Sequence, residues 1–558
     1  MLSVKANFVT ARKGGSVTRN IKATTSRLLA AKQAQLYQQS CISNLSTENQ
    51  PTDVALEWQR ARPFSEIPKA SAFKFISKFL PGGPYSKLDF SQLVTAMLKD
   101  YGPIFLMPAM PGRPSILVTH NPDDFENLFR NEGAWPIRPL SEAVRYYRNK
   151  LRADFFEGVE GVIATHGEQW SSFRTIVNPI LMKPKNTNMY LNKMAQVNQE
   201  FVDKIRLIRN PDTLEMPDDF KEYLQRWALE SVAIVALDKQ LGLLRDDSEN
   251  SSEVLKLFSA LNDFMELSFD LEYKPTLWRV VATPKFRRLM RAMDDIKSVT
   301  WKFVTEAVRK LEVEKQQGIE QPEHKKSVLE RLIKRNDRVA AVMAMDMMMA
   351  GVDTTTSLVA GALLCLAKNP EKQARLRAEV MRVLPQKNSN FTADALNNIP
   401  YLRACLKESL RVYPIAIGNM RVPQNDLVLS GYRVPKGTLV SMIFSTLQAN
   451  ERYFARPLEY LPERWLRSGE EDHEPNTAAA TKCAQSLKPS SPFVYLPFGF
   501  GPRVCVGRRI SELEVEAGIA RLVRNFNIEF NYPTDNAFKS VLINMPNIPL
   551  RFKLTDID

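Results

Sequence analysis

The chain has 558 residues and a net charge of +14, from 76 basic and 62 acidic side chains. Apolar residues make up 44% and charged residues 25%, the balance of a folded globular protein, which excludes a disordered or collagen-like chain. The nearest pair of its five cysteines, Cys483 and Cys505, is 22 positions apart, which excludes a paired-cysteine zinc module and argues against a disulfide framework.

The first 47 residues have a composition of their own. They contain no Asp or Glu and hold seven Lys or Arg, half of the net charge, among Ser and Thr residues and without a long apolar run. Such a composition is typical of a mitochondrial transit peptide, and a disordered basic tail is the alternative. We therefore expect a transit peptide over residues 1–45, with an approximate end, and a single domain over residues 46–558. The matrix is reducing, so free thiols are expected.

The rest of the chain predicts a mainly α protein with small β-sheets. Hydrophobic periodicity predicts strands at 104–106, 115–118 and 427–434 and from 526 to the end, and helices such as 189–206 and 286–315. A polar segment low in aromatic residues, 469–491, predicts a surface loop.

The longest apolar stretch, residues 339–367, is long enough to cross a membrane. Asp346 and Asp353 lie inside it, and carboxylates are costly within a membrane. The stretch therefore predicts a buried helix that crosses the protein. Cys365 within it and Cys405 further along lie on apolar helix faces and are expected to be core residues.

A glycine-rich loop, PFGFGPRVCVGRR at residues 497–509, contains the most informative pattern. Gly499 and the neighbouring glycines leave room for the backbone to approach a flat, bulky group. Cys505 precedes an amphipathic helix whose positive end, with the N–H groups of the loop, favours a thiolate. Arg503 provides a guanidinium suited to a carboxylate, and Phe498 can shield the sulfur from water. These features suit a haem iron held by one cysteine thiolate.

The loop resembles the haem-binding signature of the cytochrome P450 family, FxxGxRxCxG, at every defined position. The resemblance implies a cytochrome P450 fold, with a long central helix across the haem and a smaller β-rich N-terminal region. It also implies haem b as the cofactor, with Cys505 as the thiolate ligand of the iron and with Arg503, Phe498 and Gly499 in the cofactor site. A structural cysteine in a glycine-rich turn is the alternative.

The long apolar helix contains AGVDTT at residues 350–355, which resembles the oxygen-activation motif of the family, (A/G)Gx(D/E)T(T/S). Its small residues are expected to leave a gap on one helix face. The hydroxyl of Thr354 is expected to bond the carbonyl of Ala350 and to loosen the helix there. Asp353 and Thr354 form an acid–alcohol pair able to pass protons inward, and the resemblance makes them the catalytic pair. Plain helix packing is the alternative.

Glu408 and Arg411 stand three residues apart and share a helix face. The resemblance implies that they form a buried group with an arginine from a PERF-like segment. That segment reads PERW at residues 462–465, which provides Arg464 and places Trp465 where the family usually has Phe. The three charged residues are expected to fix the core beneath the cysteine loop and to take no part in the chemistry. As an exposed pair they would contribute little.

Trp170 and Arg174 are four residues apart on a predicted helix. In the resembled family these positions reach the haem propionates, and the resemblance gives Arg421 and Arg503 the same role. Several arginines that converge on two carboxylates are chemically sensible. Ordinary surface positions are the alternative.

From about Arg60 to its end the chain resembles insect mitochondrial cytochrome P450s, notably at residues 61–68 and 430–437. The resemblance implies electrons from NADPH through a ferredoxin reductase and a ferredoxin, on the matrix side of the inner membrane with peripheral contact to that membrane. The mildly basic remainder gives no reason to expect nucleic acid. Electrostatic steering would dock the acidic ferredoxin on Arg403, Lys407, Arg508 and Arg509. Ordinary exposed helix charges are the alternative.

Together these patterns predict a haem-thiolate monooxygenase that inserts one atom of O2 into a lipophilic substrate, with clearance of xenobiotics such as insecticides favoured. Hydroxylation of ecdysteroids or other endogenous steroids is the alternative, and a reductase-independent isomerase and a haem sensor are weaker ones. The neighbours of the two haem-facing motifs are candidates for an adaptable pocket wall: Met347, Met348, Ile415, Ala416 and Ile417.

Overall fold

The computed structural model describes residues 51–69, 71–109, 114–139, 141–245, 251–272, 276–319, 321–467 and 487–557. The chain divides into two compact units, residues 1–63 and residues 64–558. Helix α2 (Pro51–Arg60) belongs to the first unit. The predicted transit peptide lies outside the described residues, as does most of the predicted surface loop at 469–491, so both stay predictions.

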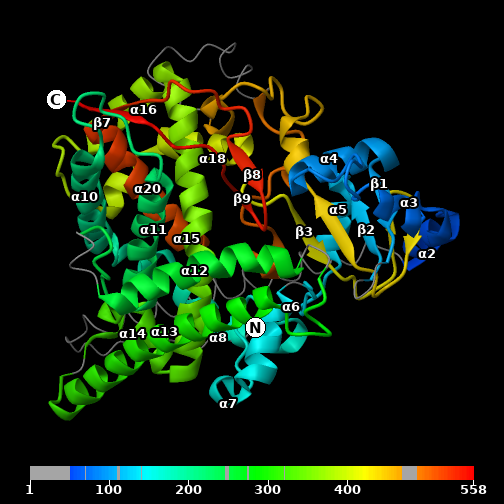
Figure 1. The fold of residues 1–558 in the computed structure, drawn as a ribbon, viewed down its shortest axis with the longest axis horizontal. Helices are drawn as coiled ribbons and strands as arrows, with labels where there is room; N and C mark the ends of the chain where they lie inside the picture. The colour runs from blue at the N-terminus through cyan, green and yellow to red at the C-terminus, as the bar shows by residue number, and fades with distance from the viewer. Residues whose placement is uncertain are drawn as a thin grey trace, which may run out of the picture. The chain divides into compact units, whose positions relative to one another are not determined.

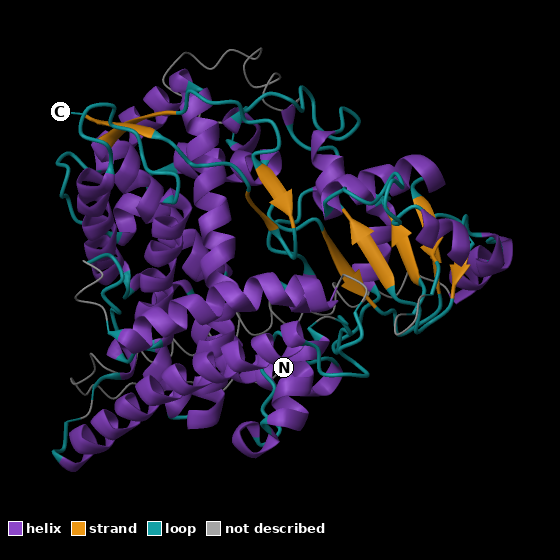
Figure 2. Ribbon diagram, viewed as in Figure 1, coloured by secondary structure: helices purple, strands orange, loops and turns teal. Residues whose placement is uncertain are grey.

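The larger unit is built mainly from helices, as predicted (Figure 1, Figure 2). Its α-helices are α3 (Ala72–Ser77), α4 (Phe90–Tyr101), α5 (Pro122–Arg130), α6 (Glu142–Tyr146), α7 (Ala153–Phe156), α8 (Gly167–Leu181), α9 (Pro184–Asn188), α10 (Leu191–Ile208), α11 (Phe220–Ala236), α12 (Ser252–Glu272), α13 (Pro284–Gln316), α14 (Val328–Ile333), α15 (Asp337–Lys368), α16 (Pro370–Val383), α17 (Ala393–Asn397), α18 (Pro400–Val412) and α20 (Arg508–Asn525). Helices α10 and α13 confirm the two long helices predicted at 189–206 and 286–315.

One four-stranded sheet lies to the side of the helices (Figure 2). Its order is β1 (Ile104–Met107), β2 (Ile116–Thr119), β6 (Val440–Ile443) and β3 (Gly418–Arg421). Strands β1 and β2 are antiparallel, β2 and β6 are parallel, and β6 and β3 are antiparallel. The first two strands confirm the predictions at 104–106 and 115–118. The sheet places residues 104–119 beside residues 418–443, which are far apart in the sequence.

Three two-stranded sheets complete the β-sheets of the described residues. They pair β4 (Leu427–Leu429) with β5 (Tyr432–Val434), β7 (Phe526–Glu529) with β10 (Lys553–Asp556), and β8 (Phe538–Ser540) with β9 (Asn544–Pro546). The strand predicted at 427–434 is therefore a hairpin. Ser430 and Gly431 both have positive φ, 48° and 76°, which is the backbone geometry of a tight hairpin turn.

Helix α15 is the long buried helix predicted from residues 339–367. The side chain of Asn336 accepts a hydrogen bond from the N–H of Val339 and so caps its start, and Pro370 follows its end. Among the described residues it is the one helix long and apolar enough to cross a membrane, and 83% of its most apolar window is buried. Burial inside the protein therefore accounts for its composition.

Two glycines allow α11 to approach its neighbours closely. A Cβ on Gly351 of α15 would lie 2.7 Å from Cγ2 of Val232 on α11, and a Cβ on Gly518 of α20 would lie 2.6 Å from the ring of Trp227 on α11. Three helices of the core therefore meet through contacts that a larger residue would block. Val232 therefore packs against Gly351, one of the small residues expected to leave a gap on one helix face.

Candidate active site

A cavity of about 470 Å³ lies between the middle of α15 and the glycine-rich loop before α20. Its wall is mainly apolar, as in most small-molecule sites. From α15 it is bordered by Met343, Asp346, Met347, Met349, Ala350, Gly351, Thr354, Thr355 and Leu358. From the loop and the start of α20 it is bordered by Leu496, Pro497, Phe498, Gly499, Arg503, Val504, Cys505, Val506, Gly507, Ile510, Ser511 and Glu514.

Cys505 faces this cavity from the loop. Of the three cysteines in the described part of the chain, Cys505 is the one whose side chain is exposed, and it lies inside the cavity with protein around it. Cys365 and Cys405 are buried in the core as predicted. Burial raises the pKa of the Cys505 thiol, and the backbone N–H of Gly507 and the charge of Arg174 act in the opposite direction. The loop thus carries groups that stabilise a thiolate, as its sequence predicted.

The backbone of the loop explains its glycines. Gly499 and Gly501 have φ values of 76° and 72°, where other residues are strained. A Cβ on Gly501 would also collide with the carboxylate of Glu132. The N–H of Cys505 donates to the carbonyl of Phe498 at 2.9 Å, which closes the loop. Phe498 borders the cavity, and its ring carries the guanidinium of Arg508 on one face at 5.5 Å.

Buried cations gather beside Cys505. The guanidinium carbon of Arg503 lies 4.2 Å from the ring centre of Trp170, and that of Arg174 lies 5.9 Å from it. Arg503 donates to the carbonyl of Thr165 at 2.7 Å and Arg174 to that of Val504 at 2.6 Å, yet Nη1 of Arg503 and Nε of Arg174 have no hydrogen-bond partner. Burial, then the charges of Arg138 and Arg421, lowers the pKa of Arg503 to about 8.

Such a cluster is stable only with an anion beside it, because buried donors and charges without partners are costly. Two carboxylates on a flat group would supply that anion. Arg138 also borders this end of the cavity, and sequence reasoning missed it because no motif surrounds it. Trp170, Arg174 and Arg503, by contrast, lie together where the sequence predicted them.

Arg421 lies elsewhere. It is not among the residues that border the cavity, and its fully buried guanidinium pairs with Glu132 and donates to Oδ1 of Asn419 at 2.7 Å. Burial raises the pKa of Glu132, and Arg421 and Arg503 act against this shift. The structure gives Arg421 a carboxylate of the protein as one partner, and its Nη2 has no hydrogen-bond partner among the described residues, so its role toward a cofactor carboxylate stays a prediction.

The cavity-facing part of α15 contains Ala350 and Thr354. Oγ1 of Thr354 donates to the carbonyl of Ala350 at 2.7 Å, the bond predicted from the sequence. The α-helix continues through the motif, from Asp337 to Lys368. Within this otherwise buried helix Ala350 is exposed, since its side chain borders the cavity.

Asp353 points away from the cavity, toward α11. Its buried carboxylate accepts a hydrogen bond from Nε2 of Gln225 at 2.6 Å, and the same nitrogen donates to Asn262 on α12 at 3.0 Å. Burial raises the pKa of Asp353, while Gln225 acts against this shift. The predicted acid–alcohol pair is therefore split between two faces of the helix, and Gln225 is a partner that the sequence did not indicate.

Glu408 on α18 is the centre of a buried polar network. It pairs with Arg411 at 2.9 Å and with Arg464 at 3.0 Å, and all three side chains are at most 1% exposed. Trp465 also donates from Nε1 to Glu408 at 2.8 Å. The three predicted residues are thus together and buried.

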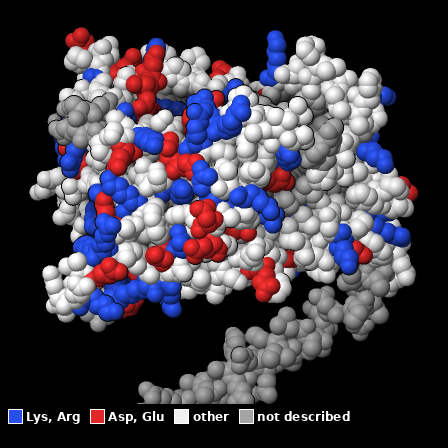
Figure 3. Space-filling model, turned by 60° about the horizontal axis from the view of Figure 1, so that its bottom comes forward, with Lys and Arg blue, Asp and Glu red and all other residues white. Residues whose placement is uncertain are grey.

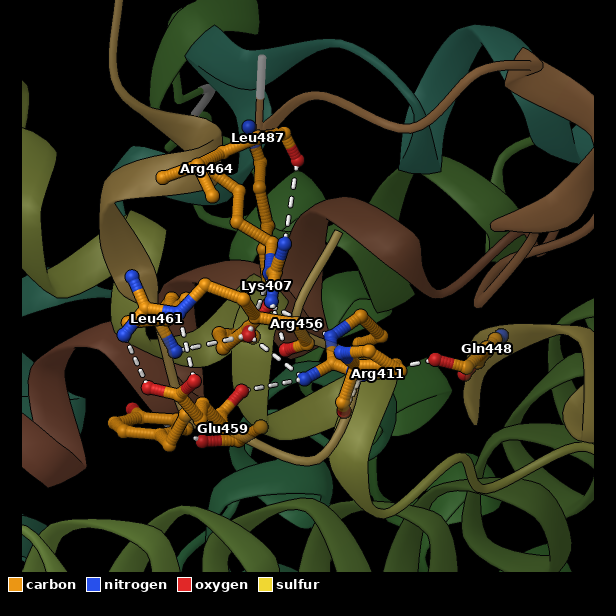
Figure 4. A network of polar contacts seen from close by, with 12 residues as sticks. Lys407, Arg411, Gln448, Arg456, Glu459, Leu461, Arg464 and Leu487 are labelled. Carbon is orange, nitrogen blue, oxygen red and sulfur yellow. Dashed lines mark hydrogen bonds and ion pairs between the residues drawn. The ribbon is translucent and has the colours of Figure 1, made fainter. Parts of the chain in front are cut away.

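The network supports the cysteine loop through aromatic packing. The ring of Trp465 lies 4.4 Å from that of Tyr495, three residues before Phe498, and the hydroxyl of Tyr495 donates to the carbonyl of Lys407 at 3.0 Å. The start of the loop is therefore attached to α18, as the sequence predicted. The outer parts of Arg411 and Arg464 donate to backbone carbonyls, including those of Gln448 and Arg456 (Figure 4).

The four predicted docking residues lie on α18 and at the start of α20. Arg403 pairs with Glu516 at 3.0 Å, and Arg508 and Arg509 both pair with Glu512, at 2.7 and 3.1 Å. Two carboxylates therefore offset half of the charge of the four cations. Lys407, four residues after Arg403 on α18, is exposed.

Of the five predicted pocket residues, Met347, Ile415, Ala416 and Ile417 border the cavity. Met348 does not, because it is fully buried on another face of α15. Other methionines that the sequence did not single out border the cavity as well: Met265, Met343, Met349 and Met420.

Three acids border the cavity, Glu272, Asp346 and Glu514, and the sequence assigned none of them to the site. Asp346 pairs with Arg148 at 2.6 Å, and both side chains are 1% exposed. Glu514 receives a long hydrogen bond of 3.5 Å from Thr355, and burial raises its pKa well above the usual range. A sequence signal existed for Glu514, since it lies on the same face of α20 as the apolar Ile510 and Ala517.

Comparison with known proteins decides the family. The family model described as Cytochrome P450 matches residues 82–554. The chain belongs to the cytochrome P450 family. It is 53% identical to cytochrome P450 CYP12A2 of Musca domestica over 522 residues, which cover 93% of this chain and 95% of that protein.

Other relatives come from Drosophila melanogaster. The chain is 56% identical to probable cytochrome P450 12a5, mitochondrial, over 503 residues, with 90% of this chain and 92% of that protein covered. It is 41% identical to probable cytochrome P450 12d1 proximal, mitochondrial, over 497 residues, with 89% and 92% covered. These findings confirm the predicted resemblance to insect mitochondrial members.

As a cytochrome P450, the protein is a haem-thiolate monooxygenase. Its residues fit the cofactor that the family binds. A thiol and a set of buried cations with unsatisfied donors border one cavity, as an iron porphyrin with two carboxylates requires.

Proposed function

We propose that this protein is a mitochondrial monooxygenase that receives electrons from NADPH through a ferredoxin reductase and a ferredoxin and oxygenates a lipophilic substrate. The observation that carries the proposal is that the thiol of Cys505 and the hydroxyl of Thr354, from two different elements, border the same apolar cavity. Haem, when bound there, supplies an iron that binds dioxygen and accepts electrons singly.

The residues of this chain would share the work around that group. Cys505 would hold the iron through Sγ, with Phe498 and Gly499 beside it, and Trp170, Arg174 and Arg503 would hold the carboxylates. Thr354 would place a hydroxyl proton at the cavity. Asp353 would hold a proton on the outer side of α15, where its raised pKa favours the acid form.

The location rests on two features. The acid-free basic leader is typical of mitochondrial import, and the relatives from Drosophila melanogaster are named as mitochondrial. Exposed apolar side chains, Phe73 at 83% and Val280 at 83% among them, favour peripheral contact with the inner membrane from the matrix side.

The ferredoxin would dock on Arg403, Lys407, Arg508 and Arg509. The pairs of Arg508 and Arg509 with Glu512 are partly exposed and therefore weak, so an acidic partner can replace Glu512 as the counter-charge of these two arginines. Nucleic acid is not an expected partner. On the face that Figure 3 presents, Lys and Arg intermix with Asp and Glu and form no continuous basic stripe.

Clearance of xenobiotics such as insecticides is the favoured role. The cavity wall contains Met265, Met343, Met347 and Met349, and flexible thioether side chains adapt to differently shaped ligands. Hydroxylation of ecdysteroids or another endogenous steroid is the second candidate. A panel of steroids and insecticides, titrated against the haem absorption band, separates the two by which class binds.

The decisive experiment uses the mature protein with haem, ferredoxin, ferredoxin reductase and NADPH. We expect substrate-dependent NADPH oxidation with product formation. The Cys505→Ser variant should lose the long-wavelength absorption of the reduced carbon monoxide adduct, while Cys405→Ser, in the core, should keep it. A variant at 505 that retains the band would remove this residue as the iron ligand.

For Thr354→Ala we expect NADPH oxidation to continue while product falls about tenfold and hydrogen peroxide rises, because the hydroxyl at the cavity is lost. Product, peroxide and NADPH are measured in the same reaction. Thr356→Ala is the matched control, since Thr356 is fully buried on the same helix and does not border the cavity. Equal coupling in the two variants would argue against a proton role for Thr354.

A further inference from the structure

Two polar residues of α12 border the cavity away from the cysteine loop. Ser268 and Glu272 are four residues apart and therefore lie on one face of the helix. Helix α12 crosses α15 and ends beside α6 (Figure 1). Between and around them the wall is apolar, with Phe264, Met265 and Met347.

Ser268 is buried without a partner. Ser268 is 6% exposed, and its Oγ forms no hydrogen bond within the described residues. A serine inside a helix commonly donates to the carbonyl four residues earlier, but this one does not. A buried hydroxyl without a partner is costly. Rotation about a single bond can turn this hydroxyl to a partner in the cavity.

Glu272 is the last residue of α12. Its Oε1 accepts a hydrogen bond from the N–H of Ala143, at the start of α6, at 2.9 Å. The C-terminal end of a helix disfavours negative charge, whereas the start of a helix favours it. Glu272 therefore stabilises the start of α6 and also places an acidic group at the cavity.

Asp346, another acid that borders the cavity, has a different role. Asp346 accepts from Arg148 at 2.6 Å and from the N–H groups of Val162 and Ile163 at 2.7 and 3.3 Å. These contacts attach the segment before α8 to α15. The hydrogen bonds of Asp346 are thus made within the protein, so we expect the polar residues of α12 to bind the ligand.

We propose that the substrate is an apolar molecule with a hydrogen-bond donor at one end, a hydroxyl or a protonated amine, which Ser268 and Glu272 bind. This inference rests on the proposal that the cavity holds the substrate of the monooxygenase. The apolar body would lie against the methionine-rich wall. Binding of a donor would give the buried hydroxyl of Ser268 a hydrogen-bond partner and place the donor beside the acidic Glu272.

The test compares three ligands of one size with the haem-loaded protein: adamantyl alcohol, its methyl ether and the matching tertiary amine. Affinities are measured by isothermal titration calorimetry, which needs no electron donor. We expect the alcohol and the amine to bind about tenfold more tightly than the ether, because a hydrogen bond to a charged group is worth about that factor.

Two variants assign the preference to α12. Glu272→Gln keeps an oxygen acceptor for Ala143 but removes the charge, so it should weaken the amine about tenfold and the alcohol less. Ser268→Ala should reduce the preference for the alcohol over the ether. Glu266→Gln and Ser259→Ala, exposed positions of the same helix, are the matched controls and should change neither.

Equal binding of the three ligands by the unmodified protein would overturn the proposal. So would an equal loss for all three ligands in Glu272→Gln, since that result means that the residue only holds α6. These results are separate from a failure of the proposed monooxygenase, which would show as absent carbon monoxide absorption or absent ferredoxin-dependent NADPH oxidation.

Discussion

Glu408 accepts five hydrogen bonds although its side chain is fully buried. Two come from Arg411, one from Arg464, one from the N–H of Leu461 and one from Trp465. A buried carboxylate is tolerated only when charges and donors surround it in this way. Trp465, the departure from the family pattern, is therefore a functional part of the network, because its indole N–H provides a donor that Phe lacks.

For Trp465→Phe we expect the free energy of unfolding to fall by about 2 kcal/mol, the typical loss for a hydrogen bond to a charged group. The haem absorption spectrum should be retained, since Arg411 and Arg464 still neutralise Glu408. Thermal unfolding followed by circular dichroism measures the change. Trp135→Phe, at a position that is 53% exposed, is the control and should have almost no effect.

At the scale of the element, the position of α15 depends on the close approach to α11 that its small residue Gly351 permits. The contact of Gly351 with Val232 holds α11 against the middle of α15, and Gln225 on α11 holds Asp353 in the same region. Gly351 and Val232 both border the cavity, so their contact helps to shape its wall, whereas Asp353 is held by Gln225 and does not border it. The motif at 350–355 thus combines packing against α11 with residues that border the cavity.

For Gly351→Ala we expect a loss of about 1–2 kcal/mol, because the new methyl group overlaps Val232 by more than a side-chain shift relieves. The double variant Gly351→Ala with Val232→Ala should recover part of that loss, since Ala is the better helix former once the overlap is gone. Denaturant unfolding of all four proteins gives the coupling. Additive effects would show that the two residues do not press on each other.

At the scale of the whole molecule, charge is distributed unevenly between the parts of the chain. Half of the net positive charge lies in the first 47 residues, and the rest of the protein is only mildly basic. A ferredoxin would therefore be guided by a local group of cations. The group on α18 and α20 is partly neutralised by Glu512 and Glu516, so its field is modest and sensitive to salt.

For Lys407→Glu together with Arg509→Glu we expect the KM for ferredoxin to rise about tenfold at low ionic strength, because steering charges become repulsive. Near 1 M salt the difference should shrink, since screening shortens the range of the charges to about 3 Å. Reversal of Arg288 and Lys302 on α13 is the control for net charge. A loss independent of salt would point to misfolding and not to docking.

Local patterns were enough to predict the class of the fold and the position of the main elements. The two long helices, the first two strands and the burial of α15 follow from hydrophobic periodicity, which depends on neighbours in the sequence. The turn inside the segment 427–434 was not predicted, because Ser430 is an uncommon residue at positive φ. The cysteine loop and the Glu408 network were predictable because their residues lie in short motifs.

The sequence by itself determined the family, the cofactor and the residues that surround Cys505, because glycine spacing, a thiol and charged pairs are local chemistry. Only the tertiary structure decided which partner each of the remaining groups has. Arg421 pairs with Glu132, Asp353 accepts from Gln225, and Val232 packs against Gly351. These contacts join residues far apart in the chain, and the close packing of a core, not any local pattern, selects them.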